Sequence, residues 1–310
     1  MRLLRLIPDK TNIDFVGARK SAFIFTVLIF LAAIGSLAVQ GFNLGIDFAG
    51  GILIEAKSDH DIDVGGLREQ LHGLNLGSVE LQQFGGPREV LIRVQQQEGG
   101  EAANRAAIES VRGTLGQGWE YRRVELVGPK VGGELFQDGV IATVLALLGI
   151  GLYVAFRFEW QFGVAALVAT AHDVFVTAGL FSLFQLEFDL NAVAALLTLA
   201  GYSINDTVVI FDRIREIMRR NRSLSMAEVI NLATNETLGR TILVSLSTLL
   251  AITPLLLFGG SALFNFTVAL TFGIVLGTYS TIYVASSLLL YMKPIQNNRA
   301  DTSGQADQPA

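Results

Sequence analysis

Long apolar runs separated by short polar segments dominate the chain. A helix needs about 20 apolar residues to cross a bilayer core, and six of the runs approach or exceed that length. The last two come from Thr241–Met292, 52 residues without a charge, which Gly259-Gly260-Ser261 should divide with a turn. We expect transmembrane helices at residues 21–41, 139–156, 162–184, 190–211, 241–258 and 264–292. The pattern predicts a polytopic α-helical membrane protein.

Residues 42–138 interrupt this pattern and have the alternation of a small folded domain. Strand-like segments at 52–56, 79–82, 90–94 and 121–127 are separated by two segments with helical spacing. Gly85-Gly86-Pro87 supplies a hairpin signal between the second and third strands. The order strand, helix, strand, strand, helix, strand is that of a ferredoxin-like α+β unit. At about 97 residues, such a unit can bury a core of its own.

Lysine and arginine are distributed unevenly among the connections. Residues 1–20 carry five of them and residues 213–240 carry six, whereas the short connections 185–189 and 259–263 carry none. Cytoplasmic loops are enriched in these residues, so we expect both termini inside and residues 42–138 outside. The tail 293–310 is expected to be disordered. The cytoplasmic loop 212–240 is expected to hold an interfacial helix that starts at a capping box, Ser225 to Glu228, and to contact anionic membrane lipid.

Composition narrows the possible functions. Only 16% of residues are charged, against about 25% in average domains, and the net charge is −5. A nucleic-acid partner normally requires a basic face, so none is expected. There are no cysteines and three histidines, with no metal-binding array and no P-loop. We therefore expect no metal, no cofactor and no enzyme activity.

Two charged residues near the cytoplasmic side of the membrane are the main candidates for chemistry. Asp206 lies in the fourth apolar run, where an ionised carboxylate costs about 2.5–3.5 kcal/mol, and Arg240 lies at the start of the fifth. The functional interpretation is a protonatable relay whose pairing with Arg240 breaks and reforms. The structural alternatives are a static ion pair, or an Arg240 that extends to the interface.

The third run contains a second polar site, His172-Asp173, close to the membrane midplane. Adjacent helical residues point about 100° apart, so the two should not face the same partner. A role in a proton relay and a structural contact between helices both remain open here. Gly273 and Gly277 form a GxxxG pattern that favours close helix packing.

Several motifs resemble the SecD/SecF family. Phe42–Gly51, which includes Gly45, Asp47, Gly50 and Gly51, resembles its opening motif, and Val127–Gly132, with Gly128 and Pro129, its second motif. Ala200–Glu216, with Asn205 and Asp206, is very close to the fourth helix of this family. Asn235–Thr241 and Gly277–Ser280 are similar to its later helices. The resemblance covers about residues 8–294, and Ala49 and Ser247 stand where Thr is common.

This resemblance implies a proton-driven accessory of the Sec translocase in the bacterial inner membrane, related to RND transporters. Asp206 and Arg240 match the residues that serve proton conduction in the family, and residues 42–138 would be periplasmic. The energy source would be the proton gradient. The implied partners are SecD, the SecYEG translocon, an emerging preprotein and, as a further candidate, YajC.

Two other functions fit parts of the pattern. One is half of an RND-type small-molecule efflux transporter, which shares the topology. Such halves usually carry a far larger external domain, so a compact domain of about 97 residues favours export. The other is a passive membrane scaffold without ion flux, against which Asp206 argues.

Overall fold

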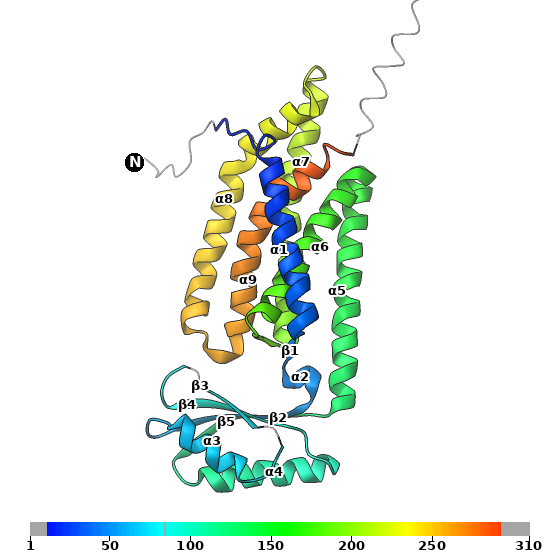
Figure 1. Cartoon of the computed structure of the whole chain (residues 1–310). Helices are drawn as coiled ribbons and strands as arrows, with labels where there is room; N and C mark the ends of the chain where they lie inside the picture. The colour runs from blue at the N-terminus through cyan, green and yellow to red at the C-terminus, as the bar shows by residue number, and fades with distance from the viewer. Residues whose placement is uncertain (1–10, 78, 84, 293–310) are drawn as a thin grey trace, which may run out of the picture.

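The computed structural model describes residues 11–77, 79–83 and 85–292, and shows a helical bundle with a small α+β domain at one end (Figure 1). Residues 1–10 and the expected tail 293–310 lie outside the described residues. The end of the bundle that faces the α+β domain is called the domain side below. All six expected membrane helices are present and long enough to span a bilayer.

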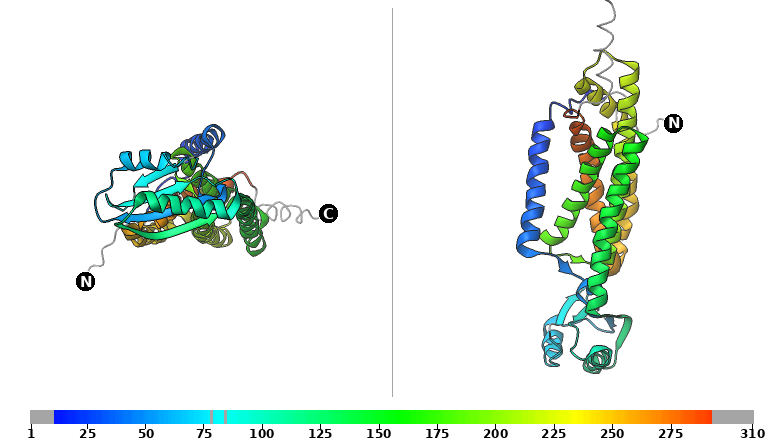
Figure 2. Two further views of the ribbon diagram at one scale, coloured as in Figure 1. Left: turned by 90° about the horizontal axis from the view of Figure 1, so that it is seen from below. Right: turned by 90° about the vertical axis from the view of Figure 1, so that its right-hand side faces the viewer.

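The six spans differ in how deeply they are buried. The central helices are α6 (Trp160–Leu183), α7 (Leu190–Arg220) and α9 (Gly260–Ser280), whereas α1 (Arg19–Gln40), α5 (Pro129–Arg157) and α8 (Met226–Phe258) lie outside them. The outer helices expose many large apolar side chains, as a surface in contact with lipid requires. The right-hand view of Figure 2 shows α1, in blue, along one edge of the bundle. After α9 the last span continues through a π-helical turn, η1 (Thr281–Ala285), into α10 (Ser286–Leu288).

Small residues let the central helices approach closely. A Cβ on Gly273 would lie 2.5 Å from the Leu199 side chain, and one on Gly277 would lie 3.5 Å from Ser203, so α9 packs on α7 through this face. This confirms the packing role expected for the GxxxG pattern. On α6, a Cβ on Gly179 would lie 2.3 Å from Ala33 of α1. Such contacts favour helix association in membranes.

The α+β domain has the expected ferredoxin-like topology. Its strands are β2 (Gly51–Ser58), β3 (Val79–Gln83), β4 (Glu89–Val94) and β5 (Trp119–Val127), and they form an antiparallel sheet in the order β3-β4-β2-β5. Helices α3 (Val64–His72) and α4 (Gly100–Leu115) cover one face, over a core that includes Ile52, Ile54 and Ile92. The other face is turned toward the bundle (Figure 1).

The helix expected within residues 212–240 does not stand alone. Helix α7 extends to Arg220, and α8 begins at Met226 and runs without a break to Phe258. The expected capping box is present, since the Ser225 side chain accepts from the Glu228 N–H and the Glu228 side chain accepts from the Ser225 N–H. The helix continues into the span because the sequence between this cap and the span contains no Pro and only one Gly, Gly239. A single Gly lowers the stability of a helix but does not end it.

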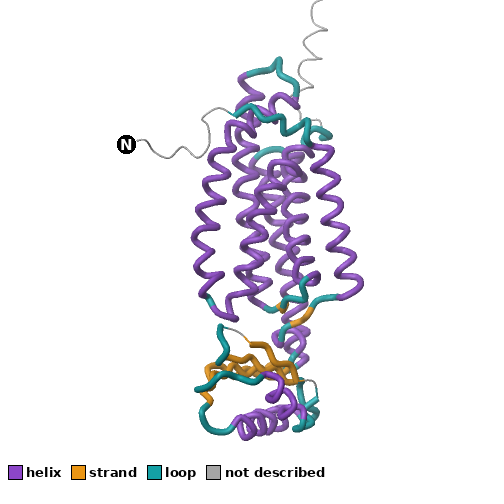
Figure 3. Tube along the Cα trace, turned by 60° about the vertical axis from the view of Figure 1, so that its left-hand side comes forward, coloured by secondary structure: helices purple, strands orange, loops and turns teal. Residues whose placement is uncertain are grey.

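A two-strand element at the domain side was not expected. Strand β1 (Asn43–Leu44) pairs in parallel with β6 (Glu187–Phe188), which lies between α6 and α7. A single turn of helix, α2 (Ile46–Ala49), follows β1. Figure 3 shows these short strands between the bundle and the sheet.

Candidate functional site

Helix α7 places Asp206 inside the bundle. Asp206 is only 3% exposed, and its Oδ2 atom has no hydrogen-bond partner among the described residues. The neighbouring turns of α7 present hydroxyl groups, because Ser203 and Thr207 lie three residues before and one residue after it. An ionised carboxylate in such a place needs a partner or a proton.

Arg240, on α8, lies within electrostatic range of Asp206. The described residues show no ion pair within 4 Å between the Asp206 carboxylate and any cation, and Arg240 is exposed. The structure therefore brings the two expected partners into the same region without joining them. Arg240 and the N-cap Ser225 belong to the same continuous helix, α8.

Asp173, on α6, is held very differently. Its carboxylate accepts hydrogen bonds from the Ser203 hydroxyl at 2.7 Å and from the Ser280 hydroxyl at 2.5 Å, and it lies 3.0 Å from His172 Nδ1. The residue is fully buried. It thus joins α6 to both α7 and α9. The two adjacent side chains contact each other but take different partners, as the 100° spacing predicts, because Asp173 binds the serines and His172 stacks on Phe30.

His172 also faces α1. Its ring stacks on Phe30 with centroids 6.1 Å apart, and its Nε2 atom has no hydrogen-bond partner among the described residues. Two further contacts between hydroxyl groups join other parts of the bundle. One joins Thr207 to Thr281 at 3.0 Å, and the other joins Ser245 to Thr278 at 2.7 Å. The first of these contacts joins α7 to η1, and the second joins α8 to α9.

Sequence reasoning missed Ser203, Ser280 and Thr281 as members of this network. A signal was available, because Ser and Thr in an apolar span hydrogen-bond across helices. It is a weak signal here, since many other hydroxyls in the spans bond only to their own helix, as Thr198 and Thr253 do. Thr281 also opens the π-helical turn, a feature that is frequent at functional sites.

Asn205 takes a different position from its neighbour Asp206. It is exposed on the surface of α7, in a row of small or polar exposed residues that we call the α7 stripe. The stripe is Ala194, Thr198, Gly201 and Asn205. The structure therefore separates Asn205 from the buried carboxylates.

The glycine motif expected to matter, 42–51, connects three parts of the molecule. The Asp47 carboxylate accepts a hydrogen bond from the Leu190 N–H at 3.0 Å, at the start of α7. Gly51 has φ of +138°, and a Cβ there would lie 2.9 Å from the Val94 carbonyl oxygen, so the close strand pairing requires glycine. Gly50 also has positive φ, and Gly45 donates its N–H to the Phe188 carbonyl at 2.9 Å.

The second motif begins helix α5. Gly128 is its N-cap and Pro129 is its first residue. Proline fits this position because the N–H that it lacks would have no partner within the helix. One turn later, a Cβ on Gly132 would lie 2.5 Å from the Phe48 carbonyl oxygen. The two motifs are therefore in direct contact. Over the described residues, no group of three potential metal ligands occurs.

Comparison with known proteins decides the family. The family described as "Protein export membrane protein SecD/SecF, C-terminal" matches residues 107–294, and the "SecD/SecF GG Motif" matches residues 35–62. The chain belongs to the SecD/SecF family. The first match includes α7 and α8, with Asp206 and Arg240, and the second includes the segment 42–51.

Members of the SecD/SecF family resemble the chain over nearly its full length. It is 42% identical over 298 residues to "Protein translocase subunit SecF" of Cereibacter sphaeroides, covering 93% of this chain and 92% of the relative. It is 44% identical over 281 residues to the protein of the same name from Pseudomonas aeruginosa, covering 91% and 92%. These names describe a transport role and carry no suggestion of drug efflux.

A solved structure in the SecD/SecF family has the same fold. SecDF from Thermus thermophilus, described as a translocon-associated membrane protein, superposes with a TM-score of 0.83 at 39% identity over 93% of this chain. The chain spans 40% of the length of that SecDF polypeptide. Six membrane helices and a ferredoxin-like domain between the first two therefore correspond to one part of that longer polypeptide.

Proposed function

We propose that this chain is the SecF subunit of a SecD–SecF complex that couples proton flow across the bacterial inner membrane to protein export through the Sec translocase. The observation that carries the proposal is the buried Asp206 carboxylate, with an unpartnered oxygen and Arg240 nearby. A carboxylate held in this way can change its charge without breaking a hydrogen bond at that oxygen. Intramembrane carboxylates are functional by default.

The proposed orientation follows from the basic residues. Arg219, Arg220 and Arg222 lie exposed around the connection between α7 and α8, at the end of the bundle opposite the α+β domain. The positive-inside rule then makes that end cytoplasmic and the α+β domain periplasmic. The same arginines are suited to contact anionic lipid.

The proposed mechanism uses two states of the site. With Asp206 ionised, its attraction to Arg240 offsets part of the cost of a charge in the membrane. A proton arriving from the periplasmic side cancels this charge and releases Arg240, so α7 and α8 can shift. Each proton supplies about 2.3 kcal/mol per 100 mV, enough to bias states that differ by a few kcal/mol.

SecD is the proposed partner because the chain corresponds to part of SecDF. The α7 stripe is the proposed contact, since small residues allow helices to approach closely and Asn205 can hydrogen-bond there. SecYEG, an emerging preprotein and YajC are proposed as further partners on the strength of the SecF name alone.

The test is proton flux in vesicles that contain SecD and this chain. Asp206→Asn preserves the shape and removes the titratable group, so we expect flux and proton-driven export to be lost while the complex still assembles. The matched control is Asp212→Asn, an exposed carboxylate on the same helix, which should leave both unchanged. Full flux in Asp206→Asn would show that Asp206 is structural and would overturn the proposal.

A further inference from the structure

The start of α7 is fastened to the segment that leads into the α+β domain. Besides the β1–β6 pairing, Asn43 donates its side-chain amide to the Gln185 carbonyl at 3.0 Å. The Asp47 carboxylate accepts from the Leu190 N–H, so it completes the N-terminus of α7 together with Asp189, which accepts from the Ala192 N–H at 2.8 Å. Helix N-termini attract such carboxylates. The segment 43–47 therefore moves with the end of α7.

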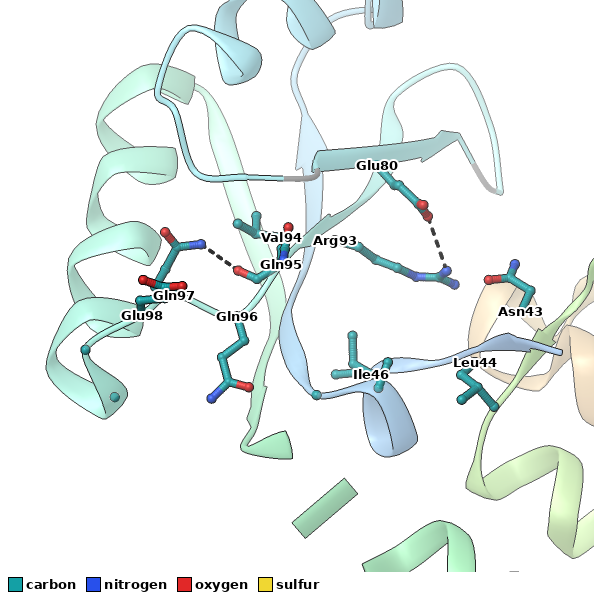
Figure 4. Close-up of a pocket in the computed structure, with 14 residues that line it drawn as sticks. Asn43, Leu44, Ile46, Glu80, Arg93, Val94, Gln95, Gln96, Gln97 and Glu98 are labelled. Carbon is teal, nitrogen blue, oxygen red and sulfur yellow. Dashed lines mark hydrogen bonds and ion pairs between the residues drawn. The ribbon is translucent and has the colours of Figure 1, made fainter. Parts of the chain in front are cut away.

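Arg93 of the sheet reaches this joint. Arg93 lies on β4, on the face turned toward the bundle, and its guanidinium forms an ion pair with Glu187 of β6. It also lies 3.8 Å from Glu80 on β3, and it points toward Asn43 (Figure 4). The Arg93 and Glu187 side chains are only 14% and 17% exposed, whereas Glu80 is 68% exposed.

Charge and burial make this contact costly to break. Burial lowers the pKa of Arg93, while the nearby carboxylates of Glu80 and Asp189 raise it. Burial likewise raises the pKa of Asp189, against its hydrogen bond from Ala192. Separating the sheet from the joint would remove the Arg93 guanidinium from Glu187 and leave it beside Glu80 alone, a far more exposed carboxylate, so the buried ion pair would be lost.

Beyond this contact, the same face of the sheet borders a cleft of about 960 Å³. Leu53 and Arg123 line it from the sheet, and Leu257 and Phe264 line it from the bundle. Broad packing therefore does not couple the centre of the sheet to α8 and α9. A localised ion pair beside a cleft can pass on a movement while the rest of the interface opens or closes.

We propose that the Arg93–Glu187 ion pair transmits movement of the outer end of α7 to the α+β domain, with Arg93 as a positioning residue. This inference rests on the proposed function, because α7 is the helix that carries Asp206. The peptide connections into the domain come from α1 and lead to α5, and only segment 43–47 of the first also contacts the start of α7, whereas the ion pair joins that region to the sheet itself. The ion pair reaches α7 itself, through the loop that immediately precedes it.

The test measures proton flux and proton-driven export separately. In vesicles with SecD, Arg93→Gln and Glu187→Gln should each keep Asp206-dependent flux, while proton-driven export falls at least about fivefold, the lower end of couplings between sites. The exchange Arg93→Glu with Glu187→Arg should restore most of the export. The control is Arg105→Gln, which breaks an exposed pair with Glu101 on α4 and should change neither readout.

Three outcomes would overturn the inference. These are unchanged export in both single variants, loss of flux together with export, and failure of the exchange to restore export. The abundance of the complex is measured for every variant. If one of the two single variants does not accumulate, the other single variant carries the test. Loss of flux in Asp206→Asn is scored separately, so failure of the proposed function is not mistaken for failure of this link.

Discussion

Asp173 and Asp206 are two buried carboxylates of one bundle in opposite circumstances. The Asp173 carboxylate has two serine donors and an imidazole within hydrogen-bond distance, whereas Oδ2 of Asp206 has no partner among the described residues. A satisfied carboxylate fixes the groups around it, and an unsatisfied one gains from binding a proton. At the scale of the residue, Asp173 is suited to hold α6, α7 and α9 together and Asp206 to change charge.

This difference predicts a stability effect for the serines. Ser203→Ala and Ser280→Ala each remove one donor to the Asp173 carboxylate, so each should lower the free energy of unfolding by about 1–3 kcal/mol. Thermal unfolding of the purified protein in detergent measures the change. Ser247→Ala is the control, because Ser247 is exposed and its hydroxyl bonds only to its own helix. Equal stability of all three variants would contradict the role assigned to Asp173.

At the scale of the element, the contact between α2 and α5 depends on one glycine. Gly132→Ala would place a methyl group 2.5 Å from the Phe48 carbonyl oxygen, so backbone must shift. We expect a loss of about 1–3 kcal/mol in stability, the usual cost of overpacking. The neighbouring Gly133 has open space around its Cβ position, and Gly133→Ala should be neutral or stabilising by up to about 1 kcal/mol. Melting temperatures that do not distinguish the two variants would refute this.

Elements with a long periodic pattern could be predicted, and very short ones could not. The alternation in 121–127 predicts β5, which spans Trp119–Val127, because Tyr121, Val124 and Leu126 pack against the core. Strands β1 and β6 are two residues each, too short for any period, and only tertiary pairing defines them. The helix expected in 212–240 starts at its predicted cap but continues into the fifth span. A cap marks where a helix starts, whereas the length of the helix depends on the residues beyond its first turns.

The candidate site was predictable only in part. Asp206 and Asp173 stand out in the sequence because each is a charge within an apolar run. Which of them is satisfied depends on Ser280, more than one hundred residues further along from Asp173, and no local pattern brings these residues together. Arg93 is one of many charges in the α+β domain, and only its ion pair with Glu187 distinguishes it.

At the scale of the whole molecule, the orientation can be tested directly because the chain has no cysteine. Glu101→Cys lies on the exposed surface of α4, and Arg222→Cys lies exposed between α7 and α8. In intact inner-membrane vesicles turned inside out, a membrane-impermeant maleimide should label position 222 and spare position 101. In spheroplasts the pattern should reverse. Labelling of position 101 in inverted vesicles would invalidate the orientation and any periplasmic role of the domain.

The turn η1 has a consequence for how the chain tolerates changes in length. A π-helical turn holds one residue more than the α-helix around it, and η1 interrupts the last span at Thr281–Ala285. Deleting one residue there would leave regular helix and keep the register of Ser286, Ser287 and Leu289, which are all buried. The same deletion in the unbroken helix α6 would rotate every residue beyond it by about 100° and turn its buried face outward. Single-residue gaps between relatives should therefore collect at η1 and avoid α6.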